Sequence, residues 1–372
     1  MASTSLSENI TEMKILFLCG SLEPGFDGVG DYTRRLAAEL IRKGHQSTIV
    51  ALSDNNEREI SAETQHCEGI NISVLRIPYF LSSKQRYKKT AQYIKEFNPD
   101  WVSLQFVPYS FNSKGLPFLM SSFLKKLKGK HNWHIMFHEL WLGIDKEAPF
   151  KHKCIGWLQQ SIIKSIIRTT KPNRIHTQNK LYRFYLRKNN VRAQVLPICG
   201  NIPVTAVKKE SPEFTQFVLF GSIHVGAPFK DFVNDLLSNS GIFFKPIKFV
   251  FIGKNGGELS DYKTVLENSN ISYNVLGIQS EKVISQVLSD SDFGISTTPY
   301  FQTEKSGVYA AYREHQLNTI CVSRNWTPTK GKYDIPQIIK YEKNNLNLVP
   351  KNVEVFDLQI MTNQFINSIS TP

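Results

Sequence analysis

Short apolar runs alternate with amphipathic helical patterns along most of the chain. In the first half, the apolar runs predict buried strands, and apolar residues at helical spacing between them predict helices. The predicted strands span 14–20, 45–52, 72–78, 100–106, 133–140, 174–179 and 192–198, and the predicted helices span 31–43, 86–97, 156–168 and 180–188. This alternation indicates a parallel sheet with helices on both faces.

The alternation stops at residues 199–213, where glycine, proline and charged residues follow no period, and we interpret this segment as an inter-domain linker. Beyond it, strands are predicted at 215–222, 247–253, 273–277, 292–299 and 318–325, and helices at 229–240, 280–291, 306–315 and 355–369. The pattern therefore predicts two doubly wound, Rossmann-like α/β domains, over 1–200 and 201–354. Residues 355–372 are expected to form a C-terminal helix that can pack back on the first domain.

Two such domains joined by a short linker leave a cleft between the carboxyl ends of two parallel sheets, where such sheets bind ligands. Gly28, Val29 and Gly30 are predicted to form a loop at the mouth of the first strand, just before a helix. Glycine lets the backbone approach a ligand, and a helix start offers N–H groups to an anion. A glycine-rich turn without a ligand is the alternative. A dinucleotide site is not favoured, because the segment is too long for G-x-G-x-x-G and no acidic residue is expected to end the second strand.

Several motifs, taken in order, resemble those of family 4 glycosyltransferases of the GT-B fold. "GFDGVGDYTRRLAAELIRKGHQSTIVA" is similar to the N-terminal signature of that family, and "NPDWVSLQF", "FHELW", "VLPICGNI", "FVLFGS", "FVFIGKNGG" and "SDFGISTTPYFQTEKSGVYAAYREHQLNTICVSRN" are similar to its later motifs. The resemblance covers most of the chain. It implies two Rossmann-like domains facing across a cleft, and transfer of a sugar from a nucleotide-sugar donor to a glycan, lipid-linked or small-molecule acceptor.

The sequence departs from the family pattern at the expected donor site. Ser222 stands where the family usually has an arginine, and the family's pair of glutamates is missing, its places falling near Thr303 and Ala311. These departures leave open whether the transfer retains or inverts the anomeric configuration. They also favour the alternative function, a non-catalytic GT-B homologue that binds a glycan or a protein partner.

The resemblance places the donor pyrophosphate at Lys305, Ser306, Gly307 and Val308. A cation, a hydroxyl and the N–H groups at a helix start can together stabilise a leaving diphosphate without a metal. The alternative is that Ser306 only caps the helix.

Three further residues are candidates for the donor site. Lys230, at the start of helix 229–240, lies near the place of the family's second phosphate cation, and the alternative is an ordinary surface lysine. Glu304 is the carboxylate beside the donor stretch and could bind the ribose or the sugar. Ser222 ends the strand that opens the second domain.

His138 lies near the end of a predicted strand, where it could hold an acceptor or sugar hydroxyl, and we take it as the catalytic candidate. His134 shares its strand face, but no third ligand stands at a recognised spacing, so no metal is expected. We expect no other cofactor, with the nucleotide sugar acting as substrate.

Positive charge is concentrated in the first half of the chain. Residues 1–200 carry 29 Lys and Arg against 16 Asp and Glu, whereas residues 201–372 carry 16 of each. A one-sided basic surface attracts anionic lipid, nucleic acid or phosphorylated substrates. The predicted helix 86–97 combines such charge with aromatic residues, through Arg86, Lys88, Lys89 and Lys95 beside Tyr87, Tyr93, Ile94 and Phe97. We therefore predict peripheral contact with an anionic membrane; a solvated lysine-rich surface is the alternative.

Other classes of protein are less consistent with the sequence. Nucleic-acid binding is not expected, because the basic residues form no dense arginine cluster and no known module. No run of about 18 apolar residues predicts a membrane helix, and the polar N-terminus lacks the order of a secretory signal. Five scattered cysteines without a CxxC pair favour reduced thiols. We expect a cytoplasmic protein, with possible attachment at the inner face of the membrane.

Overall fold

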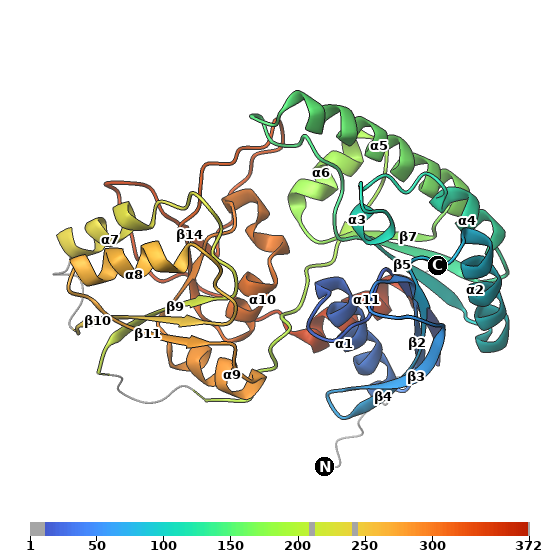
Figure 1. Ribbon diagram of the computed structural model, residues 1–372, viewed down its shortest axis with the longest axis horizontal. Helices are drawn as coiled ribbons and strands as arrows, with labels where there is room; N and C mark the ends of the chain where they lie inside the picture. Colours follow the sequence, from blue (N-terminus) through green and yellow to red (C-terminus); the bar gives the residue numbers. More distant parts are fainter. Residues whose placement is uncertain (1–11, 208–212, 240–244, 371–372) are drawn as a thin grey trace, which may run out of the picture. The chain divides into compact units, whose positions relative to one another are not determined.

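The computed structural model describes residues 12–207, 213–239 and 245–370 (Figure 1). The chain divides into two compact units, each assembled from separate stretches. The first comprises Met1–Trp141, Trp157–His176 and Ile366–Pro372, and the second comprises Leu142–Gly156 and Thr177–Phe365. No helix in the described ranges is both long enough and apolar enough to cross a bilayer.

The larger sheet has eight strands in the order β3-β4-β2-β1-β5-β6-β7-β8. They are β1 Lys14–Cys19, β2 Gln46–Asp54, β3 Ser61–Cys67, β4 Ile70–Pro78, β5 Trp101–Phe106, β6 Asn132–Phe137, β7 Arg174–Thr177 and β8 Gln194–Val195. β1 lies between β2 and β5 and pairs with both in parallel. The sequence analysis missed β3, which pairs antiparallel with β4 at the sheet edge. Its residues are mostly polar and only one of them is buried, so no apolar run marks it.

The described residues before the smaller sheet form the helices α1 Gly28–Arg42, α2 Ser83–Phe97, α3 Pro108–Phe111, α4 Met120–Lys126, α5 Phe150–Thr170 and α6 Lys180–Lys188. α1 and α2 begin three residues before their predicted starts. For α2 the reason is a capping box, in which Ser82 and Gln85 each bond the backbone of the other. Asn98 ends α2 in a left-handed conformation.

The smaller sheet has six strands, all parallel, in the order β11-β10-β9-β12-β13-β14. They are β9 Thr215–Phe220, β10 Ile247–Ile252, β11 Ser272–Gly277, β12 Phe293–Ser296, β13 Asn318–Cys321 and β14 Ile338–Lys340. The helices are α7 Phe229–Ser238, α8 Leu259–Asn268, α9 Glu281–Asp290, α10 Gly307–Glu314 and α11 Leu358–Ser370, with the 3₁₀ helix η2 at Tyr300–Lys305. The prediction that β10 runs to β11 without a helix was wrong. Parallel neighbours need a crossover, which α8 provides.

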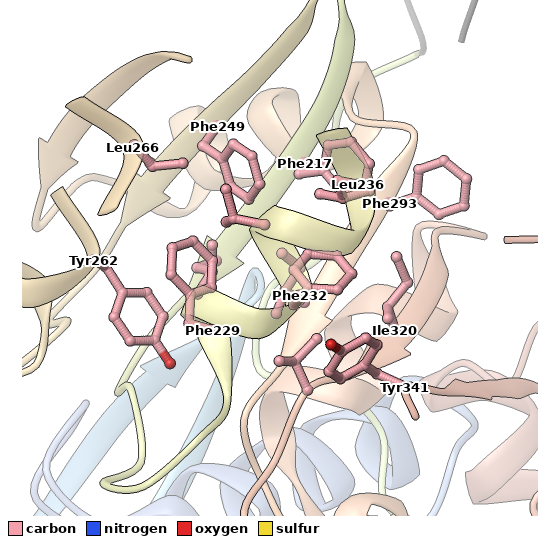
Figure 2. Packing of buried hydrophobic residues seen from close by; sticks show 14 of the residues in the cluster. Phe217, Phe229, Phe232, Leu236, Phe249, Tyr262, Leu266, Phe293, Ile320 and Tyr341 are labelled. Atoms are coloured by element: carbon pink, nitrogen blue, oxygen red, sulfur yellow. The ribbon is translucent and has the colours of Figure 1, made fainter. Parts of the chain in front are cut away.

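An aromatic cluster forms the core on one side of this sheet (Figure 2). The Phe217 ring stacks between Phe249 and Phe293, with ring centroids 5.2 Å apart in both pairs. Across from them, the Phe229 ring of α7 stacks on Tyr262 of α8 at 3.8 Å. These contacts bury α7 and α8 against β9, β10 and β12. The helix that the sequence analysis missed, α8, therefore contributes side chains to the core.

Tyr312 anchors α10 to the other face of the sheet. Its ring is fully buried and lies where a Cβ on Gly294 of β12 would be 2.6 Å away. Its hydroxyl accepts a hydrogen bond from the N–H of Phe220 at 3.0 Å. The carbonyls of Val218 and Ile295 lie 3.2 Å from the same oxygen and can accept its proton. One side chain therefore ties α10 to the ends of β9 and β12.

Replacing Tyr312 by Phe should lower the free energy of unfolding by about 1–3 kcal/mol, because the partly buried N–H of Phe220 would lose its partner. Urea denaturation measures the change. Tyr79→Phe is the control, since Tyr79 is 54% exposed and removal of its hydroxyl should change little. Equal effects of the two substitutions would contradict this role of Tyr312.

Candidate functional site

The carboxyl ends of β9 and β12 and the start of α10 surround a small pocket in the second unit. Its lining is Leu219, Phe220, Gly221, Ser222, Ile223, Ile295, Ser296, Thr297, Thr298 and Val308. Gly221 has a φ of +75°, and a Cβ there would lie 3.3 Å from the Val308 side chain. Glycine thus lets the chain turn sharply off β9 beside the helix start. In doubly wound sheets this edge is the one that binds ligands.

The start of α10 is open and is not closed by its own cap. Ser306 is the N-cap residue, but its hydroxyl accepts no hydrogen bond from the first turn of the helix. That hydroxyl instead accepts a long hydrogen bond, 3.5 Å, from the Thr298 hydroxyl. A Cβ on Gly307 would meet no atom within 4 Å. The alternative, in which the Ser306 side chain only caps the helix, is therefore not observed. The positive end of the helix dipole remains open to a ligand.

Positive side chains gather beside this helix start. The Lys305 ammonium lies 5.7 Å from the centre of the Tyr182 ring. The Cβ of Arg324 lies 3.7 Å from the place of a Cβ on Gly226, in the loop after β9. Burial, and then the charges of Arg324 and Lys305, lower the pKa of His224. His224 is held there by Thr297, whose hydroxyl oxygen accepts from the His224 N–H at 2.9 Å. The pocket edge is therefore cationic, as a diphosphate requires.

The sequence analysis missed Arg324 and His224. Arg324 comes shortly after β13 and His224 shortly after β9, and in parallel sheets residues after strand ends meet at one edge. That positional rule could have found both residues.

Glu304 lies in η2 and accepts a hydrogen bond from the Tyr333 hydroxyl on Oε2. Burial and the Glu304 charge raise the pKa of Tyr333, which keeps the phenol protonated as the donor. The second oxygen of Glu304, Oε1, makes no hydrogen bond to any described residue. One carboxylate oxygen thus fixes the side chain, and the other can accept from a ligand hydroxyl.

The other two donor candidates are exposed. Ser222 lines the pocket, and its hydroxyl donates to the Lys254 carbonyl at 3.4 Å. Lys230 is the second residue of α7 and lies outside that lining. Ser222 and Val308 thus share one pocket, whereas Lys230 stays a prediction.

The glycine segment of the first unit is helical, so the predicted loop before the helix was wrong. α1 begins at Gly28, and Asp27 caps it. Asp27 Oδ1 accepts from the N–H groups of Val29 and Gly30 at 2.9 and 2.8 Å. The N–H groups that we expected to face an anion are therefore held by a carboxylate. The reason for a glycine at position 30 is close packing, because a Cβ there would lie 2.6 Å from the Ser21 carbonyl oxygen.

The two glycines should consequently differ in stability tests. Gly30→Ala should lower the free energy of unfolding by about 1–3 kcal/mol, because the Ser21 carbonyl must move. Gly28→Ala should be neutral or stabilising by up to about 1 kcal/mol, since its position is open and helical. Urea denaturation of both variants tests this. A destabilised Gly28→Ala protein beside an unaffected Gly30→Ala protein would contradict the packing described.

An acidic residue does end the second strand, contrary to the sequence analysis, because β2 extends to Asp54. This carboxylate is fully buried and accepts from Arg76 Nε at 2.9 Å, the Ser21 hydroxyl at 3.1 Å and the Leu22 N–H at 3.1 Å. Burial acts to raise the pKa of Asp54, but the hydrogen bonds from Arg76, Asn56 and Leu22 and the charge of Arg76 hold it below its usual value. The carboxylate of Asp54 therefore has a structural role, because its oxygens bond to groups of the protein and not to a ribose.

His138 follows β6 and begins a buried chain of hydrogen bonds. His138 Nε2 lies 2.8 Å from the Gln105 amide oxygen, and Gln105 Nε2 donates to the Ser103 hydroxyl at 2.7 Å. Ser103 Oγ lies 2.7 Å from His134 Nδ1, and His134 Nε2 lies 2.9 Å from His176 Nδ1. All five side chains are at least 97% buried. We call this set the histidine relay; of its members, the sequence analysis missed Ser103, Gln105 and His176.

Gln105 determines the tautomer of His138. An amide oxygen only accepts, so the His138 proton is on Nε2, and Nδ1 is the acceptor nitrogen. Burial lowers the pKa of His138 to about 3, and burial together with the neighbouring histidines lowers that of His134 well below its usual value. Both rings are neutral at neutral pH. His138 is therefore a weak base, poorly suited to remove a proton from a hydroxyl.

Four histidine nitrogens of the relay lie within hydrogen-bond distance of amide, hydroxyl and imidazole groups. Within the described ranges, no group of three or more His, Cys, Asp or Glu residues is arranged to hold a metal ion.

His138 predicts a pH dependence of stability. Between its unfolded pKa of about 6.5 and its native value of about 3, only the unfolded chain takes up the proton. The free energy of unfolding should therefore fall as the pH falls below 6.5, by about 1.4 kcal/mol per pH unit for this residue. His138→Gln should have a correspondingly smaller slope between about pH 6 and 4 in urea denaturation series. Parallel curves for the two proteins would contradict a buried neutral His138.

Comparison with solved structures finds likeness over nearly the whole chain. The lipopolysaccharide outer core galactosyltransferase WaaB, in its apo form, has a TM-score of 0.58 at 13% identity, covering 96% of this chain and 99% of that one. HepE of Anabaena in complex with UDP-glucose has a TM-score of 0.54 at 12% identity, covering 97% and 90%. A glycosyltransferase from Rickettsia africae ESF-5 has a TM-score of 0.52 at 13% identity, covering 97% and 89%. No protein-family model and no curated protein sequence matches the chain.

These neighbours are GT-B glycosyltransferases, and at such low identity the likeness shows the fold. The predicted α/β class with two Rossmann-like domains is confirmed, since each unit is built on a sheet of mainly parallel strands. The pocket at β9, β12 and α10 thus lies at the carboxyl edge of one of these two sheets.

Proposed function

We propose that the protein is a glycosyltransferase, similar to family 4, that moves a sugar from a nucleotide-sugar donor to an acceptor hydroxyl. The observation that carries this proposal is the open, cationic start of α10 beside the carboxyl ends of β9 and β12. The full-length likeness to WaaB and to HepE with UDP-glucose supports the same class of reaction. In this proposal the second domain binds the nucleotide sugar and the first binds the acceptor.

The donor site needs no metal in this proposal. Lys305 and the N–H groups of Gly307 and Val308 stabilise the charge that develops on the leaving diphosphate. The Ser306 hydroxyl, which does not cap its own helix, donates to a phosphate oxygen. Arg324, missing from the sequence analysis, adds a second positive charge, since its Cβ lies 3.7 Å from the place of a Cβ on Gly226, in the loop after β9.

The carboxylate of Glu304 belongs to the proposed donor site in the second unit, and the imidazole of His138 to the proposed acceptor site in the first unit. Glu304 Oε1 accepts from a hydroxyl of the ribose or the sugar, while Oε2 remains on Tyr333. His138 is the candidate of the first unit for holding an acceptor or sugar hydroxyl.

Lys305→Ala should weaken nucleotide-sugar binding by about 1.5–3 kcal/mol, which is roughly 10- to 150-fold in Kd, since it removes a charge-assisted contact with phosphate. A thermal-shift screen with UDP, GDP and ADP sugars first identifies the donor, because a ligand at 100 times its Kd adds about 2.7 kcal/mol of stability. Calorimetry with that donor then compares the variants. Lys282→Ala is the matched control, an exposed lysine on α9 of the same unit. Unchanged affinity in the Lys305 variant would remove the pyrophosphate from α10.

Donor hydrolysis separates an enzyme from the alternative, a non-catalytic homologue that only binds. Slow release of free sugar from the bound donor, lost in Lys305→Ala, supports catalysis. Donor binding without any release of sugar supports the binding protein.

We further propose that the protein works at the cytoplasmic face of an anionic membrane, with α2 near the lipid. The sequence analysis based this membrane contact on both the basic and the aromatic residues of α2, but of these the structure leaves only basic ones exposed. Ile94 is buried, and the Tyr93 hydroxyl lies 2.8 Å from that of Thr48, so the apolar side of α2 faces the protein. Lys88 and Lys89 remain exposed. Attachment through α2 would therefore be electrostatic, about 1 kcal/mol for each lysine near the surface.

The double substitution of Lys88 and Lys89 by Glu should abolish sedimentation with phosphatidylglycerol vesicles at low salt. The wild-type protein should sediment at low salt and dissociate at high salt, because screening shortens the attraction to about 8 Å at physiological ionic strength. Replacing Lys282 on the second unit by Glu should have little effect. If the wild-type protein stays in solution at low salt, the acceptor is a soluble molecule.

A further inference from the structure

A second pocket, with apolar walls, lies in the first unit between α2 and the segment that links α3 to α4. α2 and α4 pack against each other (Figure 1). The cavity has a volume of about 260 Å³ and is lined by Leu52, Ser83, Arg86, Phe111, Asn112, Leu116, Pro117, Phe118, Leu119, Met120 and Phe123. Small-molecule sites usually enclose about 300–1,000 Å³, so this one suits part of a larger ligand.

Two large apolar side chains at this pocket are exposed to solvent. Phe118 is 59% exposed and Leu119 is 69% exposed, although they are adjacent in the chain. Behind them, Phe123 packs edge-to-face with Tyr87 of α2, which makes the inner wall aromatic and fixed. An apolar ligand segment would cover Phe118 and Leu119 and remove that surface from water.

Arg86 gives the pocket a positive charge without a counter-charge. Its guanidinium makes one hydrogen bond, from Nη1 to the Leu52 carbonyl at 3.3 Å. Its Nε is buried and has no partner among the described residues. No Asp or Glu among the described residues lines the cavity, and burial lowers the pKa of Arg86. A guanidinium with most of its five donors unused, in a partly desolvated place, is matched by a carboxylate or phosphate.

The pocket lies near the edge of the sheet where an acceptor would be expected. Leu52 is two residues from the end of β2, and α3 follows β5 directly. Ser110 of α3 covers the end of β1, where a Cβ on Gly20 would be 2.5 Å from the Ser110 Cβ. His138 follows β6, the neighbour of β5 in the same sheet. The pocket and His138 are thus at the same edge of the sheet.

We propose that this pocket binds a lipid phosphate, with Arg86 paired to the phosphate and the first methylenes lying against Phe118, Leu119 and Met120. This proposal rests on the proposed function and makes it more specific, because it names a lipid-linked molecule as the acceptor. The charge around the pocket favours a lipid in a membrane over a soluble amphiphile. The two helices beside the pocket carry exposed lysines. These are Lys84, Lys88 and Lys89 on α2 and Lys125 and Lys126 on α4. The remainder of a long chain would stay in the bilayer, because the cavity is small.

Calorimetry of the full chain with decyl phosphate, below its micellar concentration, tests the pocket. We expect saturable binding, at least 10-fold weaker in Arg86→Gln and several-fold weaker in Phe118→Ser. Arg86→Lys should keep part of the affinity, since it keeps the charge but not the fork of donors. Lys282→Gln is the control, an exposed lysine on α9 outside the cavity lining, and should stay within 2-fold of wild type. Phe118 is exposed, so its variant should fold even if the Arg86 variants do not.

Two companion ligands can overturn the proposal. Inorganic phosphate should bind far more weakly than decyl phosphate, and neutral decyl maltoside should bind weakly and without dependence on Arg86. Equal binding of decyl phosphate to wild type and Arg86→Gln, or equal binding of decyl maltoside and decyl phosphate, refutes a phosphate held by Arg86. Vesicles of phosphatidic acid then test whether the bound phosphate belongs to a membrane lipid or to a soluble amphiphile. Binding to them that is weakened by Arg86→Gln supports a membrane lipid, and binding that is indifferent to it refutes the membrane lipid in favour of a soluble amphiphile.

Donor binding, measured on the same variants, keeps this test separate from the proposed function. The nucleotide sugar should bind equally to wild type and to the Arg86 variants. Loss of decyl phosphate binding in Arg86→Gln with donor binding intact supports the pocket. If decyl phosphate binds as expected but no nucleotide sugar binds the wild-type protein, the proposed function fails and the pocket stands.

Discussion

The hydroxyl of Tyr312 is the contact on which the geometry of the second unit depends. It is fully buried and bonds to backbone groups at the ends of two parallel strands. Because Tyr312 belongs to α10, the same contact sets where that helix begins relative to the sheet. The open helix start, the pocket beside Gly221 and the cations around it all follow from this placement.

The constraint also explains a glycine inside a strand. Gly294 sits in β12, where a side chain would occupy the space of the Tyr312 ring. Strand glycine is unfavourable in itself, and here it allows a large aromatic ring to approach the sheet backbone. Helix and strand are thus matched by two residues that are 18 positions apart in the chain.

Local patterns were sufficient to predict most of the fold. Apolar runs located the central strands, and α6 has the predicted bounds, because its apolar face and Asn179 cap are both local signals. The elements that were missed lack such signals. β3 is polar, and α8 follows a glycine pair without a side-chain cap, its helical face being defined by Tyr262 packing on Phe229. That contact joins residues that are 33 positions apart in the sequence, so no short window contains it.

The candidate site was predictable only where it is local. Lys305, Ser306, Gly307 and Val308 are contiguous and stand at a helix start, which a family motif can mark. The histidine relay could not be predicted in the same way, because its hydrogen bonds join residues 31 to 42 positions apart in three of its four links. Asp54 shows the converse: its position at a strand end indicates a ligand, but Arg76, on another strand, makes it structural.

The histidine relay also constrains how its sequence positions can evolve. Each interior member must both give and receive a hydrogen bond, so a side chain that can do only one of these interrupts the whole series. Threonine could replace Ser103, but alanine or an acid could not serve in its place without a second change. We expect these positions to vary together among descendants of this gene, as a single unit of selection, although the residues come from three different strands and the loop after one of them.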